Sequence, residues 1–308
     1  MLWLLVFATC LSAVATASAK DDDDDNFDED RYRREEIRIP VNPDVRVDIE
    51  LISGSIEIRG WDKPEVRIRT DDDNVDGLDV RSDADWVTVR ATGVGIGWLR
   101  LPIRTGDVDL RIDLPKGSYI TAKTINGPIE ARDVEGRISF KAANGEIEVW
   151  GAPSEAILET MNSGIKFRGK GSRVDARTVN GTIDLRGVSG EVVANAISGS
   201  IHVQGDVLER ADLRSLTGSV ELETALAPGA RISCKSYSGS ISLTVPEDTS
   251  AKFDIQTFSG RIRNDLGPRS VSHWRGGPGQ RLDFEAGDGD GHVTIDTFSG
   301  SVRIRTRD

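Results

Sequence analysis

The sequence predicts an all-β fold: a single-stack β-solenoid with coils of about 18–21 residues and an irregular N-terminal β cap. Three observations predict it. A short turn returns at a fixed spacing, apolar residues alternate with other residues on both sides of each turn, and the three- and four-residue apolar spacing of helices is missing. The turn is Asn-Gly at 126–127, 144–145 and 180–181 and Ser-Gly at 198–199, so the glycines are 18 or 36 residues apart.

The 36-residue interval between Gly145 and Gly181 contains a further copy of the turn, in which the glycine stands one residue later. The segment there reads Asn162-Ser163-Gly164, and Ser163 occupies the turn position. With that correction, five successive turns share one period. Further copies of the turn occur at Gly218, Gly239, Gly260 and Gly300, and an outlying earlier copy occurs at Gly54.

Four columns of apolar residues appear when the copies are aligned on the turn. They lie two and four residues after the turn and five and seven residues before it, as in the first column: Ile56, Ile129, Ile147, Ile165, Ile183, Ile201, Val220, Ile241, Ile262 and Val302. Alternation of this kind is typical of half-buried strands. Because one coil cannot bury its apolar side alone, neighbouring coils must bury it, at roughly 1.5–3 kcal/mol for each large side chain. The residues between these columns are mostly polar.

The residue before each turn glycine is a short polar one. Asn126, Asn144, Asn162 and Asn180 occupy this position in four copies, and Ser or Thr in the others. Such side chains hydrogen-bond the backbone at bends. A hydrogen-bonded ladder that holds the corner is therefore favoured over a ligand-binding ridge.

The ends of the chain indicate an extracytoplasmic protein. Residues 1–19 form an apolar run that ends in Ala17-Ser18-Ala19, which is typical of a signal peptide, with an uncleaved anchor as the alternative. Residues 20–36 are predicted to be an acidic, disordered linker. Signal removal leaves one cysteine, Cys234, and no apolar segment long enough to span a membrane. The net charge of −12 argues against nucleic acid as a partner.

The remaining chain divides into two regions. Residues 37–118 have a looser pattern and are predicted to form the N-terminal cap, which covers an otherwise open strand edge. Residues 119–308 carry the solenoid repeats, with an inserted loop near 264–290. Within that insertion, Gln280, Leu282 and Phe284 stand at the offsets of a degenerate coil.

Together these features resemble the bacterial putative-adhesin domain family, an adhesin-like β-solenoid class of unknown function. The resemblance rests on Ser-Gly-Ser-Ile-Glu-Ile at 53–58, Gly-Trp-Asp at 60–62, the strand at 109–115 and the repeats themselves. It covers about residues 35–308. It implies a non-enzymatic, extracytoplasmic protein with a role in surface binding or as a scaffold, and it brings no catalytic residues or cofactors.

No motif in the sequence indicates catalysis or a cofactor. The three histidines, His202, His273 and His292, lack the spacing of a metal site or a catalytic triad. One segment matches the start of a calcium-binding loop, and the candidate ligands in it are Asp72, Asn74, Asp76 and Asp83. A polar acidic turn is the favoured interpretation of this segment.

Two outward columns carry charge. The residue four before the turn is mostly basic, and the residue three after it is mostly acidic, from Glu57 to Glu221. We hypothesise that the basic stripe contacts an anionic surface polymer, glycan or protein, against the favoured alternative of a solvated face. The stripe consists of Lys123, Lys141, Arg177, Arg214 and Lys235.

Two alternative functions stay open. One is a β-helix enzyme acting on polysaccharides, because Glu130 and Glu148 stack in adjacent coils at a separation compatible with a retaining glycosidase. Carboxylate pairs arise in any ladder, however, and no aromatic platform surrounds this one. The other is an assembly protein that pairs through its rod ends, where the apolar segment 94–99 with Trp98 is a contact patch or a cap plug. The oligomeric state is not predicted.

Overall fold

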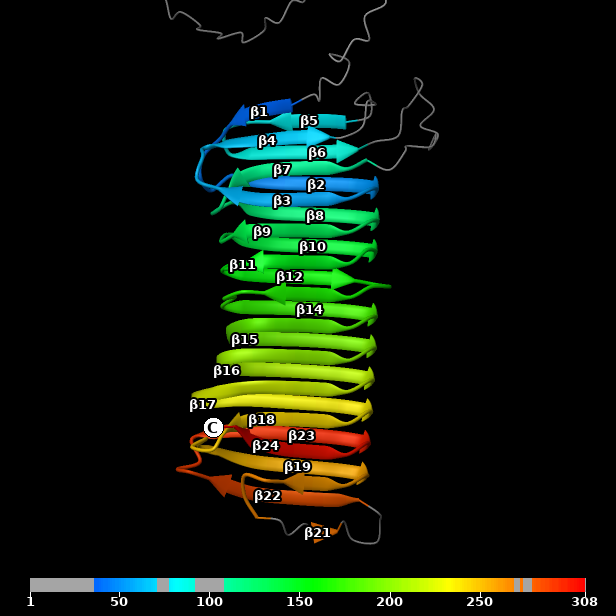
Figure 1. Cartoon of the computed structure of the whole chain (residues 1–308), viewed down its shortest axis with the longest axis vertical. Coiled ribbons are helices and arrows are strands. Elements are labelled where there is room, and N and C mark those ends of the chain that lie inside the picture. The colour runs from blue at the N-terminus through cyan, green and yellow to red at the C-terminus, as the bar shows by residue number, and fades with distance from the viewer. Residues whose placement is uncertain (1–35, 71–77, 92–107, 269–271, 274–278, 308) are drawn as a thin grey trace, which may run out of the picture. The chain divides into compact units, whose positions relative to one another are not determined.

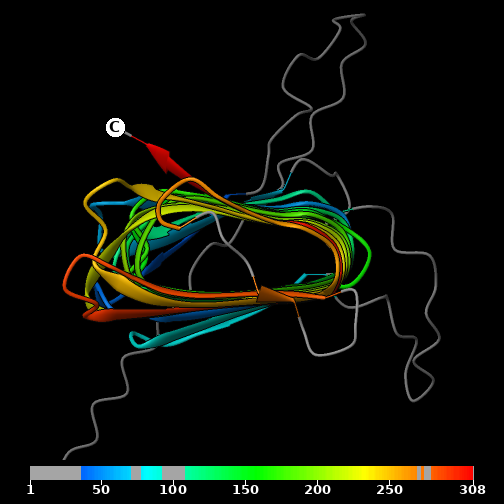
Figure 2. The same ribbon diagram turned by 90° about the horizontal axis from the view of Figure 1, so that it is seen from below.

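The computed structural model describes residues 36–70, 78–91, 108–268, 272–273 and 279–307. These residues form strands and turns that wind into stacked coils (Figure 1). Seen along the stack, each coil is a flattened oval with two long sides (Figure 2). The predicted β-solenoid is therefore confirmed. Within the described ranges, no helix is both long enough and apolar enough to cross a membrane.

One long side, the leading face, contains the strands that run into the glycine turn. The other, the trailing face, contains the strands that leave it. The leading strands are β2 (Arg46–Ser53), β6 (Trp86–Ala91), β8 (Tyr119–Asn126), β10 (Arg137–Asn144), β12 (Glu155–Thr160), β14 (Arg173–Asn180), β19 (Ala251–Ser259) and β23 (Gly291–Ser299). The trailing strands are β3 (Ile56–Trp61), β7 (Leu110–Pro115), β9 (Ile129–Val134), β11 (Ile147–Gly151), β13 (Ile165–Arg168), β18 (Ile241–Pro246), β20 (Ile262–Asn264) and β24 (Val302–Arg307).

Three longer strands continue through the second corner of the coil and serve both faces. Each begins as a trailing strand and ends as the leading strand of the next coil: β15 (Ile183–Ser198), β16 (Ile201–Thr217) and β17 (Val220–Ser238). The register shifts near Val188 and Val207, where the chain rounds this corner. Coils of 18, 19 and 21 residues can therefore stack, because the extra residues are absorbed at the second corner.

Parallel pairing places like residues beside like residues. Ile129, Ile147, Ile165 and Ile183 are direct neighbours in successive strands. Every residue of the four predicted inward columns is buried, and together they form one continuous core. The sequence-derived core is therefore confirmed.

The glycine turns stack too closely for a side chain. A Cβ atom on Gly145 would lie 1.8 Å from the carbonyl oxygen of Gly127, and one on Gly199 would lie 1.8 Å from that of Gly181. Steric exclusion therefore explains why glycine recurs at the turn.

The polar residues at the corner are hydrogen-bonded in a ladder, as predicted. The side-chain amide of Asn144 donates to Asn126 (2.9 Å), that of Asn162 to Asn144 (2.8 Å) and that of Asn180 to Asn162 (3.1 Å). A second set of bonds comes from buried hydroxyls three residues before the turn. Thr160, for example, donates to the Gly145 carbonyl oxygen at 3.1 Å.

At the N-terminal end, the copy at Gly54 is the direct neighbour of the copy at Gly127. Strand β2 pairs with β8, and β3 pairs with β9. Beyond them lie β6 and β7, followed by antiparallel strands that close the sheet edge. These are β1 (Glu36–Pro40), β4 (Glu65–Thr70) and β5 (Leu78–Ser82). The region expected as a cap thus contains one regular coil, and Glu36, assigned to the linker, begins a strand.

At the C-terminal end, spatial order departs from chain order. The last coil, β23 and β24, lies between β17–β18 and β19–β20, since β17 and β19 both pair with β23 while β18 and β20 both pair with β24. Figure 1 shows these red strands above the orange β19. The chain therefore leaves one coil position empty after β18 and forms the next coil with β19 and β20. It then returns, and β23 and β24 occupy the empty position.

The expected degenerate coil at Gln280, Leu282 and Phe284 is wrong. These residues belong to β22 (Gln280–Ala286), which runs antiparallel to β19 and, with β21 (Ser272–His273), ends the stack. Phe284 stacks on Phe253 with ring centroids 4.6 Å apart. The error has a physical reason: period-two alternation is the same in both chain directions, so it does not distinguish a coil from an antiparallel cap.

Candidate binding faces

The basic stripe predicted from the sequence lies in one column on the leading face. Parallel register places Lys123 beside Lys141, and Arg214 beside Lys235. Glu159 and Asn195 interrupt the column on either side of Arg177. The five basic side chains are thus brought to one face, within a column of mixed charge.

Each basic side chain of this stripe pairs with a carboxylate. The pairs are Lys123 with Glu50 (3.3 Å), Lys141 with Glu159 (2.8 Å), Arg177 with Asp175 (2.7 Å), Arg214 with Asp212 (2.6 Å) and Lys235 with Asp296 (3.3 Å). Burial raises the pKa of Asp175 despite its pairing with Arg177. Because neighbouring carboxylates offset the positive charge, this stripe attracts anions less strongly than its sequence suggests.

A second outward column on the leading face is apolar. It lies two residues before the turn, and its large side chains are 44–56% exposed. We call it the apolar stripe: Ile52, Ile125, Ala143, Met161, Val179, Ile197, Leu216, Tyr237, Phe298 and Phe258 in spatial order. At one end, the rings of Tyr237 and Phe298 stack at 4.8 Å and those of Phe298 and Phe258 at 4.7 Å.

Two hollows lie between the charged column and the apolar stripe. One, of about 890 Å³, runs from Lys123 to Leu216 over a floor of small residues such as Ala142 and Ala196. The other, of about 430 Å³, lies beside the stacked rings and is lined by Lys235 and Asp296 among others. The leading face therefore offers a long groove with one charged wall and one apolar wall.

Sequence reasoning missed the apolar stripe because it treated the residues between the inward columns as polar. The signal was present in the same alignment: the position two before the turn is apolar in all ten aligned copies. Alternation predicts that this position points outward, and an apolar residue at an outward position is the informative exception.

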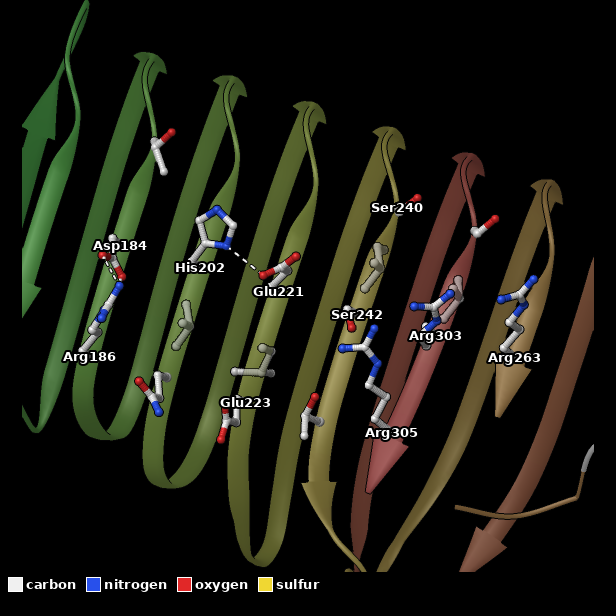
Figure 3. A pocket seen from close by; sticks show the side chains of 18 of the residues that line it. Asp184, Arg186, His202, Glu221, Glu223, Ser240, Ser242, Arg263, Arg303 and Arg305 are labelled. Atoms are coloured by element: carbon white, nitrogen blue, oxygen red, sulfur yellow. Dashed lines mark hydrogen bonds and ion pairs between the residues drawn. The ribbon is translucent and has the colours of Figure 1, made fainter. Parts of the chain in front are cut away.

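The trailing face has a hollow of about 800 Å³ near its C-terminal end (Figure 3). Asp184 and Arg186 lie at one end and are paired, with Nε and Oδ1 3.0 Å apart. The His202 ring nitrogen Nδ1 lies 3.0 Å from the Glu221 carboxylate. Three arginines, Arg263, Arg303 and Arg305, lie at the other end of the hollow. Ser240, Ser242 and Ser301 line it as well.

The carboxylates of the enzyme alternative lie in register on the trailing face. Glu130 and Glu148 are direct neighbours in β9 and β11. Each has a cation near it: Arg132 lies 3.6 Å from Glu130, and Lys166 lies 3.9 Å from Glu148. The pKa of Lys166 is raised, chiefly by its hydrogen bond to Glu146. The pair therefore belongs to a ladder in which three carboxylates, Glu57, Glu130 and Glu148, are followed by Lys166.

Several predicted sites fall outside the described residues. They include Asp72, Asn74 and Asp76 of the calcium candidate, and the segment 94–99 with Trp98. Asp83 is described, and its carboxylate accepts a hydrogen bond from the adjacent Ala84 amide at 2.7 Å. In the described ranges, no group of three or more His, Cys, Asp or Glu side chains is arranged to hold a metal ion.

Solved structures similar to this chain come from three bacteria. A "putative cell adhesion protein" from Clostridium sporogenes ATCC 15579 is 10% identical, covers 89% of this chain and 100% of its own, and has a TM-score of 0.22. A "putative adhesin" from Bacteroides fragilis NCTC 9343 is 12% identical (89% and 97% covered, TM-score 0.31). A "putative lipid binding protein" from Parabacteroides distasonis ATCC 8503 is 14% identical (89% and 97% covered, TM-score 0.39).

A search of curated proteins gives no match. A family model does match, and it covers residues 35–305, which is almost the whole of the solenoid and its caps. The family resemblance expected from the turn repeats is thereby confirmed. The chain belongs to the Toastrack DUF4097 family.

Proposed function

We propose that this chain is a non-enzymatic, adhesin-like protein that binds a linear surface polymer along its leading face, outside the cytoplasm. The observation that carries the proposal is the apolar stripe. Its eight large side chains are about half exposed and follow one another along the stack. Contiguous apolar surface of this kind is uncommon on a protein that has no binding partner.

The groove supports a linear partner with both apolar and polar groups. The apolar stripe forms one wall, and the charged column with its ion pairs forms the other. Because one wall is apolar and the other is polar or charged in every coil, a repeating partner meets the same kinds of group at each step. The aromatic stack of Tyr237, Phe298 and Phe258 adds a firmer contact at one end.

Other features support the location and the absence of catalysis. The apolar run at residues 1–19 is typical of an exported protein. Glu130 and Glu148, which would serve a glycosidase, each have a cation within 4 Å, at Arg132 and Lys166. Two carboxylates that each have a cation nearby suit a structural ladder better than acid–base chemistry.

The test is a binding array of surface glycans and cell-wall polymers, probed with the purified chain and with the variant Ile197→Ser/Tyr237→Ser. Both side chains are exposed, so the variant keeps the core, and we expect its binding to fall by at least about tenfold. Val207→Ser is the matched control, because Val207 is 48% exposed but lies at the second corner. Undiminished binding by the double variant, or release of reducing ends from a bound polymer, would contradict the proposal.

A further inference from the structure

The trailing face carries a group of arginines that have no carboxylate partner among the described residues. Arg261, Arg263, Arg303 and Arg305 lie on or next to β20 and β24, at one end of the 800 Å³ hollow. On the same face, Arg111, Arg132 and Arg186 each have a carboxylate within 4 Å, so a group of four arginines without one marks this end as different.

Two of these arginines are forced together by the fold. Arg263 and Arg303 are direct partners in the parallel pairing of β20 with β24. Strands lie about 4.8 Å apart, and like charges directly opposite one another destabilise a sheet. Such an arrangement is stabilised when an anion lies between the guanidinium groups.

The N-terminal end of the same face provides the contrast. Four arginines line a hollow there, and three of them pair with a carboxylate. The pairs are Arg69 with Asp113 (3.0 Å), Arg111 with Glu57 (3.1 Å) and Arg132 with Glu130 (3.6 Å), while Arg59 has no ion pair among the described residues. The fold therefore supplies carboxylates to most of the arginines at that end. At the C-terminal end it supplies one to Arg307, which lies 2.7 Å from Glu223, but none among the described residues to Arg261, Arg263, Arg303 or Arg305.

Serine occupies the place where a carboxylate would be expected. Ser242 lies in register between Glu221 on one side and Arg303 on the other. Ser240 and Ser301 line the same hollow. Guanidinium forks together with hydroxyl donors are the groups that bind phosphate, sulfate and carboxylate oxygens.

The rest of the hollow supplies hydrogen-bond acceptors. The carboxylates of Asp184, Glu221 and Glu223 line it with the side chain of Gln204, and their partners are Arg186, His202 and Arg307 in turn. A ligand that spans the hollow would place an anionic group on the arginines and hydroxyl groups against these acceptors. A hollow of about 800 Å³ is of the size that holds a small ligand or a few linked sugars.

We propose that this hollow binds an acidic saccharide through its oxyanion, a carboxylate or a sulfate, held by Arg263, Arg303 and Arg305. The site lies on the face opposite the apolar stripe, so it does not depend on the function proposed for the leading face. The negative charge of the ligand takes the place of the carboxylate partner that these three arginines lack among the described residues.

The test is calorimetric titration of the full chain with an oligogalacturonate and with a sulfated oligosaccharide, which separate carboxylate from sulfate. A neutral malto-oligosaccharide, inorganic phosphate and phosphatidylglycerol vesicles complete the set. We expect at least one acidic oligosaccharide to bind, the neutral one not to bind, and added salt to weaken binding. Tight binding of phosphate alone, or of vesicles in place of the oligosaccharides, would overturn the saccharide assignment, as would no binding by any probe.

Two variants locate the site. Arg263→Gln/Arg303→Gln should weaken the acidic oligosaccharide by at least about tenfold. Ser242→Glu should do the same while keeping every arginine, because it places a carboxylate beside Arg303. Arg111→Gln is the matched control, since it removes the same charge from a paired arginine on the same face. Unchanged affinity in the first two variants, with folding verified by circular dichroism, would overturn the proposal.

Discussion

At the scale of single residues, burial rather than sequence context sets the chemistry of Cys234. It lies in an inward column between Leu213 and Ile295 and is completely buried. Burial, with a smaller contribution from the negative charge of Asp212, raises the pKa of its thiol from 9.0 to about 12. The thiol is therefore protonated at physiological pH and packs as a small apolar side chain.

The raised pKa predicts how stability depends on pH. The folded-state pKa lies above the unfolded value, so the stabilisation is fully present below pH 9.0 and is lost as pH rises towards about 12. Relative to Cys234→Val, the wild type should lose about 1.4 kcal/mol of unfolding free energy per pH unit in that window. Urea unfolding of both proteins on either side of pH 9.0 measures the difference. Parallel curves for the two proteins would contradict it.

Residue positions were predictable to different degrees. The inward columns, Cys234 included, follow from alternation alone, because an apolar residue at an inward position is buried whatever its neighbours are. The ion pairs that Lys141 and Arg177 form with Glu159 did not follow, because they join side chains of different coils, and their geometry depends on rotamers. The apolar stripe followed from the alignment, but only if outward positions were examined as closely as inward ones.

At the scale of the coil, the glycine turn sets how closely coils can approach. Backbone oxygen atoms of one turn lie where the Cβ atoms of the next would be, as at Gly181 and Gly199. The asparagine ladder beside the turn adds hydrogen bonds between successive coils. Excluded volume and hydrogen bonding thus act at the same corner, which is why both residues of the Asn-Gly turn recur.

Gly199→Ala should therefore destabilise the protein by about 1–3 kcal/mol, because the new methyl group displaces the neighbouring turn. Its Cβ would lie 1.8 Å from the Gly181 carbonyl oxygen. Gly117→Ala is the control, since the nearest atom to its Cβ would be 3.4 Å away. Denaturant unfolding of the two variants compares them. Equal unfolding free energies would show that the turn can relax at no cost.

Element types were predicted better than their direction. The strands of the regular coils follow from the repeat, since each contains two inward apolar residues next to a turn. The same alternation in β22 predicts a coil, although this strand runs antiparallel to β19. Direction is decided by the connection before it, and residues 265–279 contain no repeat to indicate that connection.

At the scale of the whole molecule, the order of coils could not be predicted from the sequence. Every copy of the turn could stack on every other copy, so the sequence predicts that the coils stack in the order in which they occur along the chain. The structure instead places the copy at Gly300 between those at Gly239 and Gly260, where each glycine lies against the carbonyl oxygen of its new neighbour. The segment from β19 to β22 is long enough for the chain to return to the coil position beside β17 and β18.

The inserted coil makes a prediction about truncation. In a chain that ends at residue 290, β19 loses its parallel partner β23, so residues 251–286 should become sensitive to proteolysis. A chain that ends at residue 246 is the control, because it removes both coils and leaves β18 as an ordinary last strand. Limited proteolysis with mass spectrometry measures the rate of cleavage in both truncated chains. Full protection of residues 251–286 in the longer chain would mean that β19 can pair with β17 directly.

The position of β23 and β24 also bears on when this molecule can be completed during its synthesis. Protein synthesis proceeds from the N-terminus, and early segments can fold while later ones are still being made. Here the coils from β8 to β18 can stack in the order in which they emerge, but the next place in the stack belongs to β23 and β24, which are made after β19 and β20. This part of the solenoid therefore closes only after β24 has been made.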